Sequence, residues 1–366
     1  MENVKESKFY LIDKWLAYVV GKKVKELKLS ANLDPMLYYS LPQIFLENAR
    51  CLTILELCNI ELDTSCSFSF PSLKTLSLHD VHILDTTEDD GAFKFLLGCP
   101  SLEKLLLRDA EFDDHFRLQS SSLKFLKVDY LNMYHESYLQ VEAINLESLI
   151  LKDVIFNKID LSSCKKVRNL SLAECTEDSQ SSLQVFISNF PLLEHLTLSF
   201  YSFYEYSSKH LKISNQHLKS LIVKEYDPDE MINTITIESA PNFTSFCYRG
   251  DICFSISLES SNLLNGTFDL YEEPWLDCDT RFTNLMKFFS NFNCSWNVVS
   301  LLFHDNKALV LSEKLKNICP SPLINWKHLK LVIGEYDPEK LSDWKDSLLW
   351  ISPSLETLFI NGKLIF

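Results

Sequence analysis

Residues 99–110 read CPSLEKLLLRDA, and similar words recur along the chain. In this stretch Leu102, Leu105 and Leu107 occupy the first, fourth and sixth positions of the pattern Leu-x-x-Leu-x-Leu. Alternate side chains of an extended segment point to one face, so these leucines share one buried layer while the residues between them face outward. One such unit cannot bury its leucine layer alone. The pattern therefore predicts that neighbouring units stack against one another.

The pattern recurs with aliphatic or aromatic replacements, and its units begin at Val24, Leu52, Leu73, Leu102, Leu123, Leu146, Val167, Leu193, Leu218, Phe243, Val298, Trp326 and Leu355. Most neighbouring starts lie about 21 to 29 residues apart, which is the period of leucine-rich repeats. A degenerate unit at 263–270 fills the long interval after Phe243. The sequence thus predicts an α/β leucine-rich-repeat solenoid, a horseshoe of roughly 13 to 14 repeats with parallel strands on its concave face. Helices and irregular segments are expected on the convex face.

The expected domain organisation is a capping segment over residues 1–23 followed by repeats over 24–366, with an irregular unit near 250–297. Residues 12–20 predict a helix whose apolar face carries Ile12, Trp15, Leu16, Val19 and Val20. Such a helix caps the exposed first strand of a solenoid, or docks a partner. Further helices are expected to end at Pro100, Pro191 and Pro353, since proline ends a helix and biases its predecessor toward an extended conformation.

Short polar residues recur where the chain is expected to turn out of a strand, at Asn59, Asp80, Asp109 and Asp153. Side chains of this kind accept backbone N–H groups that a turn leaves unpaired. We interpret them as structural residues of the repeat, because they occur once per unit and do not converge on one place.

The charge and composition exclude several classes of protein. Lys and Arg total 35 against 50 Asp and Glu, a net charge of −15 that repels phosphate backbones and argues against nucleic-acid binding. Apolar runs are too short to span a bilayer and the N-terminus has no signal-peptide core, so we expect no membrane association and a cytoplasmic or nuclear location. The 11 cysteines are scattered without metal-binding spacing and are expected to be reduced and mostly buried.

The repeat register names the outward-facing residues of the predicted concave face. The middle outward position is expected to form a row of Ser77, Leu106, Lys127, Ile150, Ser171, Thr197, Ile222, Cys247, Leu302 and Phe359. A second, lateral row follows at the strand exits, with His79, Arg108, Asp129, Lys152, Ala173, Ser199, Lys224, Arg249 and His304.

Outward aliphatic side chains in a row favour an interaction surface, because a solvated sheet normally alternates cleanly. Basic residues in the lateral row favour an acidic or phosphorylated segment of a protein partner. The predicted partner-binding set is Leu106, Arg108, Ile150, Lys152, Ile222, Lys224, Arg249, Leu302, His304 and Phe359. The alternative is that these rows are a solvated ladder without a binding role.

Catalytic, cofactor and metal motifs are not predicted. The chain has 7 glycines and shows no glycine-rich phosphate loop, GxSxG or HExxH motif, so an enzyme is the least favoured class. His79 and His82 lie beside an acidic run at 88–90, but three-residue spacing on a strand does not bring two side chains to one face. We therefore expect no bound metal and no cofactor.

The words LPQIF at 41–45, FPSLKTL at 70–76 and CPSLEKL at 99–105 resemble the repeats of plant F-box proteins that carry leucine-rich repeats, and residues 4–29 resemble the segment that follows the F-box in that family. The resemblance covers essentially the whole chain. It implies a protein-interaction module like the substrate-recognition part of an SCF-type ubiquitin-ligase receptor. The F-box and the C-terminal FBD region of this family are not evident here, so the Skp-type linker and cullin are expected partners only if an F-box is supplied elsewhere. The alternative is a free-standing scaffold or decoy without ligase coupling.

Overall fold

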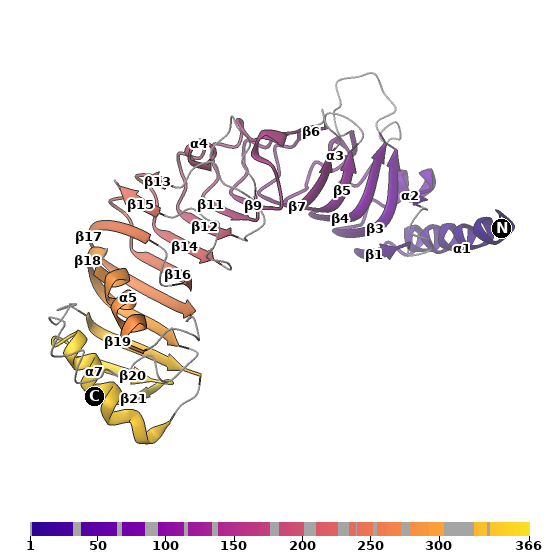
Figure 1. Cartoon of the computed structure of the whole chain (residues 1–366). Helices are drawn as coiled ribbons and strands as arrows, with labels where there is room; N and C mark the ends of the chain where they lie inside the picture. Colours follow the sequence, from indigo (N-terminus) through magenta and orange to yellow (C-terminus); the bar gives the residue numbers. More distant parts are fainter. Residues whose placement is uncertain are drawn as a thin grey trace. The chain divides into compact units, whose positions relative to one another are not determined.

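A computed structural model of the chain describes residues 2–31, 38–63, 68–84, 94–112, 116–133, 138–175, 183–200, 210–225, 234–238, 240–251, 255–271, 278–290, 292–303, 326–334 and 337–366 (Figure 1). The chain divides into two compact units, Met1–Pro191 and Leu192–Phe366. Each unit is built mainly from parallel strands with few helices, as the repeat pattern predicts.

The first unit contains α1 (Glu2–Gly21), β1 (Glu26–Ser30), β2 (Tyr39–Ser40), α2 (Gln43–Asn48), β3 (Ile54–Asp63), β4 (Thr75–Leu84), α3 (Lys94–Leu97), β5 (Lys104–Phe112), β6 (Phe116–Gln119), β7 (Phe125–Met133), β8 (Leu139–Glu142), β9 (Ser148–Lys152), a 3-10 turn (Phe156–Lys158), β10 (Ile159–Asp160), β11 (Asn169–Ala173) and α4 (Leu183–Ser188). Helices α3 and α4 end shortly before Pro100 and Pro191, as expected.

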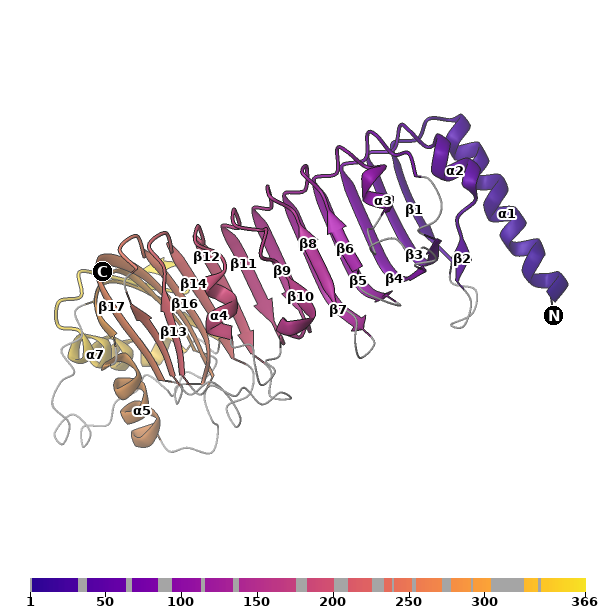
Figure 2. The same cartoon turned by 90° about the horizontal axis from the view of Figure 1, so that it is seen from above.

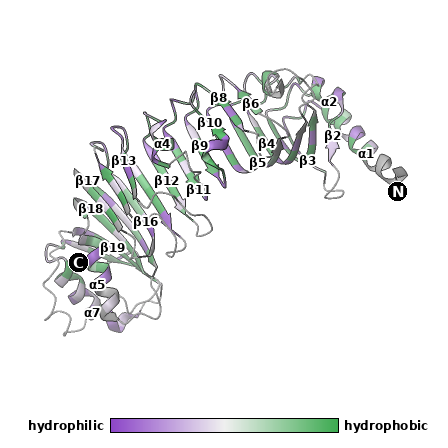
Figure 3. Ribbon diagram, turned by 45° about the horizontal axis from the view of Figure 1, so that its top comes forward, coloured by the Kyte–Doolittle hydropathy of each residue, from purple (hydrophilic) through white to green (hydrophobic). Residues whose placement is uncertain are grey.

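The repeat sheet of the first unit consists of β1, β3, β4, β5, β7, β9 and β11, each paired in parallel with the next (Figure 2). The alternating leucines of each strand lie at matching register positions; Leu55, Leu76, Leu105 and Leu126 are all 0% exposed. Hydrophobic and hydrophilic residues accordingly alternate along these strands (Figure 3). We call the opposite side of this sheet, where the intervening residues point, the open face.

A column of residues with left-handed backbone conformation crosses this sheet. Backbone φ angles between +48° and +56° occur at one register position in six repeats, at Asn59, Asp80, Asp109, Tyr130, Asp153 and Glu174. Strands β3, β4, β5 and β7 continue through this position, so the prediction that the chain leaves the strand at Asn59, Asp80 and Asp109 was wrong.

The left-handed residue shifts the alternation of the strand by one. In β5, for example, Arg108 and Asp109 are both solvent-accessible and Ala110 is buried again. A regular strand would have turned Asp109 toward the leucine layer. Asn and Asp tolerate this backbone region better than most residues, which explains their recurrence there.

A second sheet of short strands covers the other side of the first unit. Strands β6, β8 and β10 pair in parallel and contribute buried residues such as Leu118, Leu139 and Val141. The sequence predicted helices and irregular segments for this wall, and the strands were missed because each has only two to four residues.

The second unit contains β12 (His195–Phe200), β13 (His210–Ser214), β14 (Ser220–Glu225), β15 (Thr234–Glu238), β16 (Ser245–Asp251), β17 (Ser255–Tyr271), α5 (Cys278–Ser290), β18 (Phe292–Phe303), β19 (Trp326–Ile333), a 3-10 turn (Pro338–Lys340), α7 (Leu341–Ile351), β20 (Thr357–Ile360) and β21 (Lys363–Leu364). Strands β12, β14, β16, β17, β18, β19 and β20 form its repeat sheet. The C-terminal half of β17 is the degenerate unit predicted at 263–270.

Aromatic rings take the place of leucines in the core of the second unit. The ring of Phe268 lies within 5.1–6.0 Å, centroid to centroid, of Phe246, Phe288, Phe289, Phe292 and Trp296. Gly266 lies in this cluster, where a Cβ atom would come within 2.6 Å of the Trp296 ring. The absence of a side chain at this position therefore allows the aromatic layer to close.

Strands of the second unit alternate without the left-handed shift of the first. Position Glu225 consequently faces inward and is 3% exposed, beside Phe200 of β12. Its Oε2 atom accepts a 2.6 Å hydrogen bond from the hydroxyl of Tyr248, which is 0% exposed. A buried carboxylate in an apolar layer needs such a partner, because desolvation without one costs several kcal/mol, on the order of 3.

Helix α1 packs on the first repeats through Leu16, which is 2% exposed, and through Asp13, which accepts a hydrogen bond from the Tyr39 hydroxyl. Ile12, Val19 and Val20 are partly buried. Trp15, which the sequence places at the same side of the helix, is 68% exposed. Trp15 and Leu16 are neighbours in a helix and therefore point about 100° apart.

Candidate functional site

The middle row of the first unit has the composition that the sequence predicts. Strand register aligns it across the open face as Ser77, Leu106, Lys127, Ile150 and Ser171, and extends it to Glu56 and Lys28 at the N-terminal end. Leu106 and Ile150 are partly exposed there, between charged and hydroxyl side chains. The open face thus presents isolated aliphatic side chains at known positions.

The middle row of the second unit differs from the prediction: Leu302 is not a member, and the prediction missed Thr267, Ser300 and Lys330. Register aligns Thr197, Ile222, Cys247, Thr267, Ser300, Lys330 and Phe359. The placement of Leu302 in this row was wrong, because the repeat begins at Trp296 rather than Val298. Leu302 instead lies beside Asp269, in the row of Lys224 and Arg249. His304 lies outside the described residues.

The lateral row of the first unit runs Cys58, His79, Arg108, Asp129, Lys152 and Ala173, so sequence reasoning missed Cys58 as a member. The sequence could have assigned Cys58 to this row, because Cys58 directly precedes Asn59 just as His79 directly precedes Asp80.

Basic side chains of the lateral rows lie close to carboxylates. Arg108 Nε is 3.4 Å from Asp109 Oδ2, and Lys152 Nζ is 3.9 Å from Asp129 Oδ1 and 3.8 Å from Glu174 Oε2. In the second unit Arg249 Nε is 3.2 Å from Asp269 Oδ2. The sequence did not indicate these ion pairs, because each acid lies on a neighbouring repeat or at the left-handed position. The basic side chains of these pairs are 44–61% exposed, so they are accessible from solvent even though each has a carboxylate neighbour.

A hollow of about 310 Å³ opens on this face of the first unit. Its lining brings together five predicted row residues, Ser77, His79, Leu106, Arg108 and Lys127, with Lys28, Glu56 and Cys58 from the first repeats. Lys28 and Glu56 form an ion pair of 2.8 Å across its edge. The hollow therefore combines the basic side chains of Lys28, Arg108 and Lys127 with a lining of leucines, Leu29, Leu57, Leu106 and Leu107.

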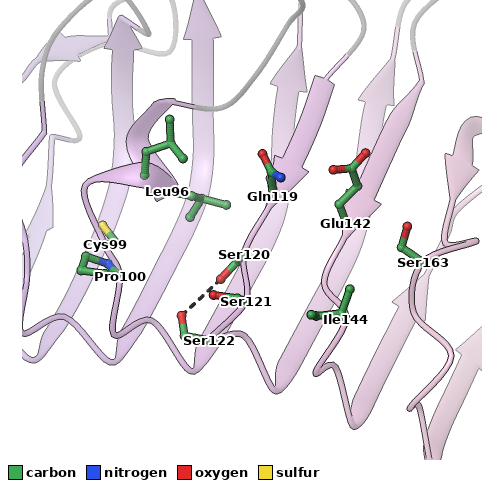
Figure 4. Close-up of a pocket in the computed structure, with 11 residues that line it drawn as sticks. Leu96, Cys99, Pro100, Gln119, Ser120, Ser121, Ser122, Glu142, Ile144 and Ser163 are labelled. Atoms are coloured by element: carbon green, nitrogen blue, oxygen red, sulfur yellow. Dashed lines mark hydrogen bonds between the residues drawn. The ribbon is translucent and has the colours of Figure 1, made fainter.

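A second hollow, of about 470 Å³, lies on the other side of the first unit, between α3 and the strands β6 and β8 (Figure 4). Its serine hydroxyls hold the fold together. Ser120 and Ser122 share a 3.2 Å hydrogen bond, and the Ser122 hydroxyl donates to the carbonyl oxygen of Leu102. Ser120 Oγ also accepts a hydrogen bond from the Leu123 amide, so these hydroxyls support the turn between two repeats.

Within the described part of the chain, no group of three His, Cys, Asp or Glu side chains is placed to hold a metal ion. His82 lies near Glu61, at 3.9 Å between Nδ1 and Oε2, rather than with His79. The acidic run at 88–90 lies outside the described residues. No helix in the described ranges is long and apolar enough to cross a membrane.

Stacked parallel strands, a buried layer of leucines and aromatic residues in each unit, and repeating outward rows are typical of a leucine-rich-repeat protein. Residues 12–168 match the family model for the leucine-rich repeats of FBD-associated F-box protein At5g56370. The chain is related to the plant F-box/LRR-repeat proteins, including their FBD-associated members, which agrees with the resemblance of its repeat words.

Three relatives come from Arabidopsis thaliana. F-box/LRR-repeat protein At1g06630 is 32% identical over 175 residues, covering 45% of this chain and 41% of the relative. F-box/FBD/LRR-repeat protein At1g13570 is 27% identical over 288 residues, covering 73% of this chain and 59% of the relative. Probable FBD-associated F-box protein At1g32375 is 34% identical over 120 residues, covering 31% and 28%. The matches span less than two thirds of each relative's own length.

Proposed function

We propose that this chain binds a protein partner on the open face of its repeat sheets, as the recognition part of an F-box-type receptor. The observation that carries the proposal is the middle row of the first unit, where Leu106 and Ile150 stand partly exposed on a face otherwise lined by charged and hydroxyl groups. Outward aliphatic residues flanked by polar ones are typical of interaction surfaces. The names of the relatives, which combine F-box and leucine-rich repeats, support a protein-interaction role.

An acidic or phosphorylated partner segment fits the lateral rows. Arg108, Lys152 and Arg249 are solvent-accessible, and each forms an ion pair with a neighbouring carboxylate. A phosphate or a run of carboxylates carries more charge than one neighbouring acid and would displace it. In the second unit, Lys224, Ile222 and Phe359 lie at outward positions of that unit's own repeat sheet.

The aliphatic part of the surface is tested by placing charges on it. The double variant Leu106→Asp with Ile150→Asp should lose the proteins that the wild-type chain captures by proximity labelling in plant cells. The matched control is Ile144→Asp with Val185→Asp, since these two aliphatic side chains are 57% and 60% exposed and lie in a turn and in α4. Loss of the same proteins from both double variants would contradict a binding role for the open face.

The charged part of the surface is tested by charge reversal. Arg108→Glu, Lys152→Glu and Arg249→Glu together should abolish capture of an acidic or phosphorylated partner while the chain remains folded. Phosphatase treatment of the lysate separates the two partner chemistries, because it weakens capture only if a phosphate is recognised. Unchanged capture by the triple variant would exclude these basic residues as partner contacts.

Coupling to a ubiquitin ligase is a further proposal. If an F-box accompanies these repeats, the Skp-type linker and cullin should copurify with the captured partner; a stable partner without them supports the free-standing scaffold instead. We propose a cytoplasmic or nuclear location, a non-enzymatic role without cofactor or metal, and a horseshoe arrangement of the repeats. Fractionation with a tagged full chain tests the location.

A further inference from the structure

Three side chains on successive strands form a chain of polar contacts at one end of the open face. The Cys58 Sγ atom of β3 lies 3.4 Å from Nδ1 of His79 in β4. The Nε2 atom of His79 lies 3.3 Å from Oδ2 of Asp109 in β5. A thiol, an imidazole and a carboxylate are thus connected in that order.

Two features of the fold bring these residues together. Strand register places Cys58 beside His79, and His79 beside Arg108, in the lateral row. The left-handed backbone of Asp109, with φ of +48°, keeps its side chain on the open face next to Arg108 rather than in the leucine layer. A regular strand would have removed the carboxylate from His79.

The Asp109 carboxylate lies 3.3 Å from Nε2 of His79, on the side of the ring away from the thiol, which lies near Nδ1. A proton on Nε2 would leave Nδ1 as the acceptor that faces the thiol. The imidazole can therefore take the thiol proton and remain stabilised as a cation between the sulfur and the carboxylate. This arrangement activates a cysteine in the way that an adjacent base activates other weak nucleophiles.

Solvent and small molecules can reach the sulfur. Cys58 is partly exposed, and both Cys58 and His79 line the hollow of about 310 Å³ together with Leu106 and Arg108. Cys99, Cys164 and Cys175, by contrast, are buried. Cys51 is the exposed cysteine of the described residues and provides an internal comparison, because it is more accessible than Cys58.

We propose that Cys58 is a reactive thiol that adds to soft carbon electrophiles of the α,β-unsaturated carbonyl class entering this hollow. His79 removes the thiol proton, and the sulfur forms a bond to the β-carbon of the electrophile. The π electrons of the carbon–carbon double bond move onto the α-carbon as an enolate, which takes the proton back from the imidazolium. The S–H bond is thereby added across the double bond, with no leaving group and no oxidant.

The experiment uses the full chain and N-ethylmaleimide as the electrophile, at pH 7 and low reagent excess, with the labelled cysteines quantified by peptide mass spectrometry. Cys58 should react at least about 10-fold faster than Cys51, because an adjacent imidazole that accepts the thiol proton assists attack by the sulfur. Equal rates, or faster labelling of Cys51, would overturn the proposal because exposure alone would then explain reactivity.

Three variants separate activation from exposure. His79→Gln should slow labelling of Cys58 by about 10-fold, and Asp109→Asn, which tolerates the left-handed backbone, should slow it by a smaller factor while Cys51 is unaffected. His82→Gln is the matched control, since His82 lies on the same strand but contacts Glu61. An unchanged Cys58 rate in His79→Gln, with circular dichroism showing a folded protein, would also overturn the proposal.

Discussion

The hydroxyl of Tyr248 and the carboxylate of Glu225 are joined by a 2.6 Å hydrogen bond between neighbouring strands of the second unit. Both side chains are buried, at 0% and 3% exposure. The backbone of Gly250 lies opposite, and its missing side chain leaves room for both groups. A polar pair therefore replaces an apolar contact at one level of an otherwise apolar layer.

Removing the Tyr248 hydroxyl should destabilise the second unit. Tyr248→Phe leaves the buried carboxylate without one of its donors, which costs about 1–3 kcal/mol in the free energy of unfolding. Urea denaturation followed by circular dichroism measures the loss. Tyr18→Phe is the control, because Tyr18 is 58% exposed and its substitution should change stability by less than about 0.5 kcal/mol. Equal stability of the two variants would show that the hydrogen bond contributes nothing.

Adding a methyl group at Gly250 should disturb the same place by crowding. A Cβ atom there would lie 2.7 Å from the Tyr248 hydroxyl oxygen and 2.8 Å from Glu225 Cβ. Gly250→Ala should therefore lower the free energy of unfolding by about 1–3 kcal/mol. Gly21→Ala, with nothing within 4 Å of its Cβ, should be neutral or stabilising in the same denaturation assay. A neutral Gly250→Ala would mean that the strands move apart at little cost.

Tyr130 has a backbone conformation that is unfavourable for a tyrosine. Its φ of +56° lies in the left-handed region, which Asn adopts more readily than Tyr. Tyr130→Asn should raise the stability by about 0.5 kcal/mol, seen as a small increase in the melting temperature. Tyr138→Asn, a similar loss of a partly exposed ring without a left-handed backbone, should not stabilise. A lower melting temperature for Tyr130→Asn alone would assign the Tyr130 ring a packing role.

Burial raises the pKa of the Cys175 thiol to about 12, from a reference value of 9.0. Between pH 9 and pH 12 the folded state keeps this proton while the unfolded chain loses it. The contribution of the Cys175 thiol to the free energy of unfolding is therefore fully present below pH 9 and is lost as the pH rises toward 12. Cys175→Ala should remove this contribution, reducing the pH slope of stability above pH 9 by at most about 1.4 kcal/mol per unit. Urea titrations at pH 8, 9 and 10 give the slope, and identical slopes for both proteins would contradict the assignment.

Repeat spacing was enough to predict the strands and most of the outward rows. Leu-x-x-Leu-x-Leu fixes which residues are buried, and parallel stacking then aligns the residues between them, as for Leu106 beside Lys127. The error at Leu302 arose where Trp296 and Gly266 occupy leucine positions, since a large ring and a missing side chain compensate one another only in three dimensions. Sequence patterns score each position alone and cannot recognise this exchange.

The contacts at the open face were harder to predict. Asp109 reaches His79 and Arg108 because its backbone is left-handed, and this conformation is shared by Tyr130 and Glu174, whose residue types give no hint of it. Cys58 contacts His79 because the register of β3 and β4 places the two residues side by side, and this register is not evident from repeats of unequal length. The composition of the surface was therefore predictable, whereas its pairings depended on backbone detail.

The left-handed column gives the six repeats that it crosses two adjacent accessible side chains at one level, as with Lys152 and Asp153, before burial resumes at Val154. Such a doublet can be exchanged for another without altering the leucines beneath it. Selection can thus change the outer surface of this protein one residue pair at a time, while the buried leucines that support each pair stay the same.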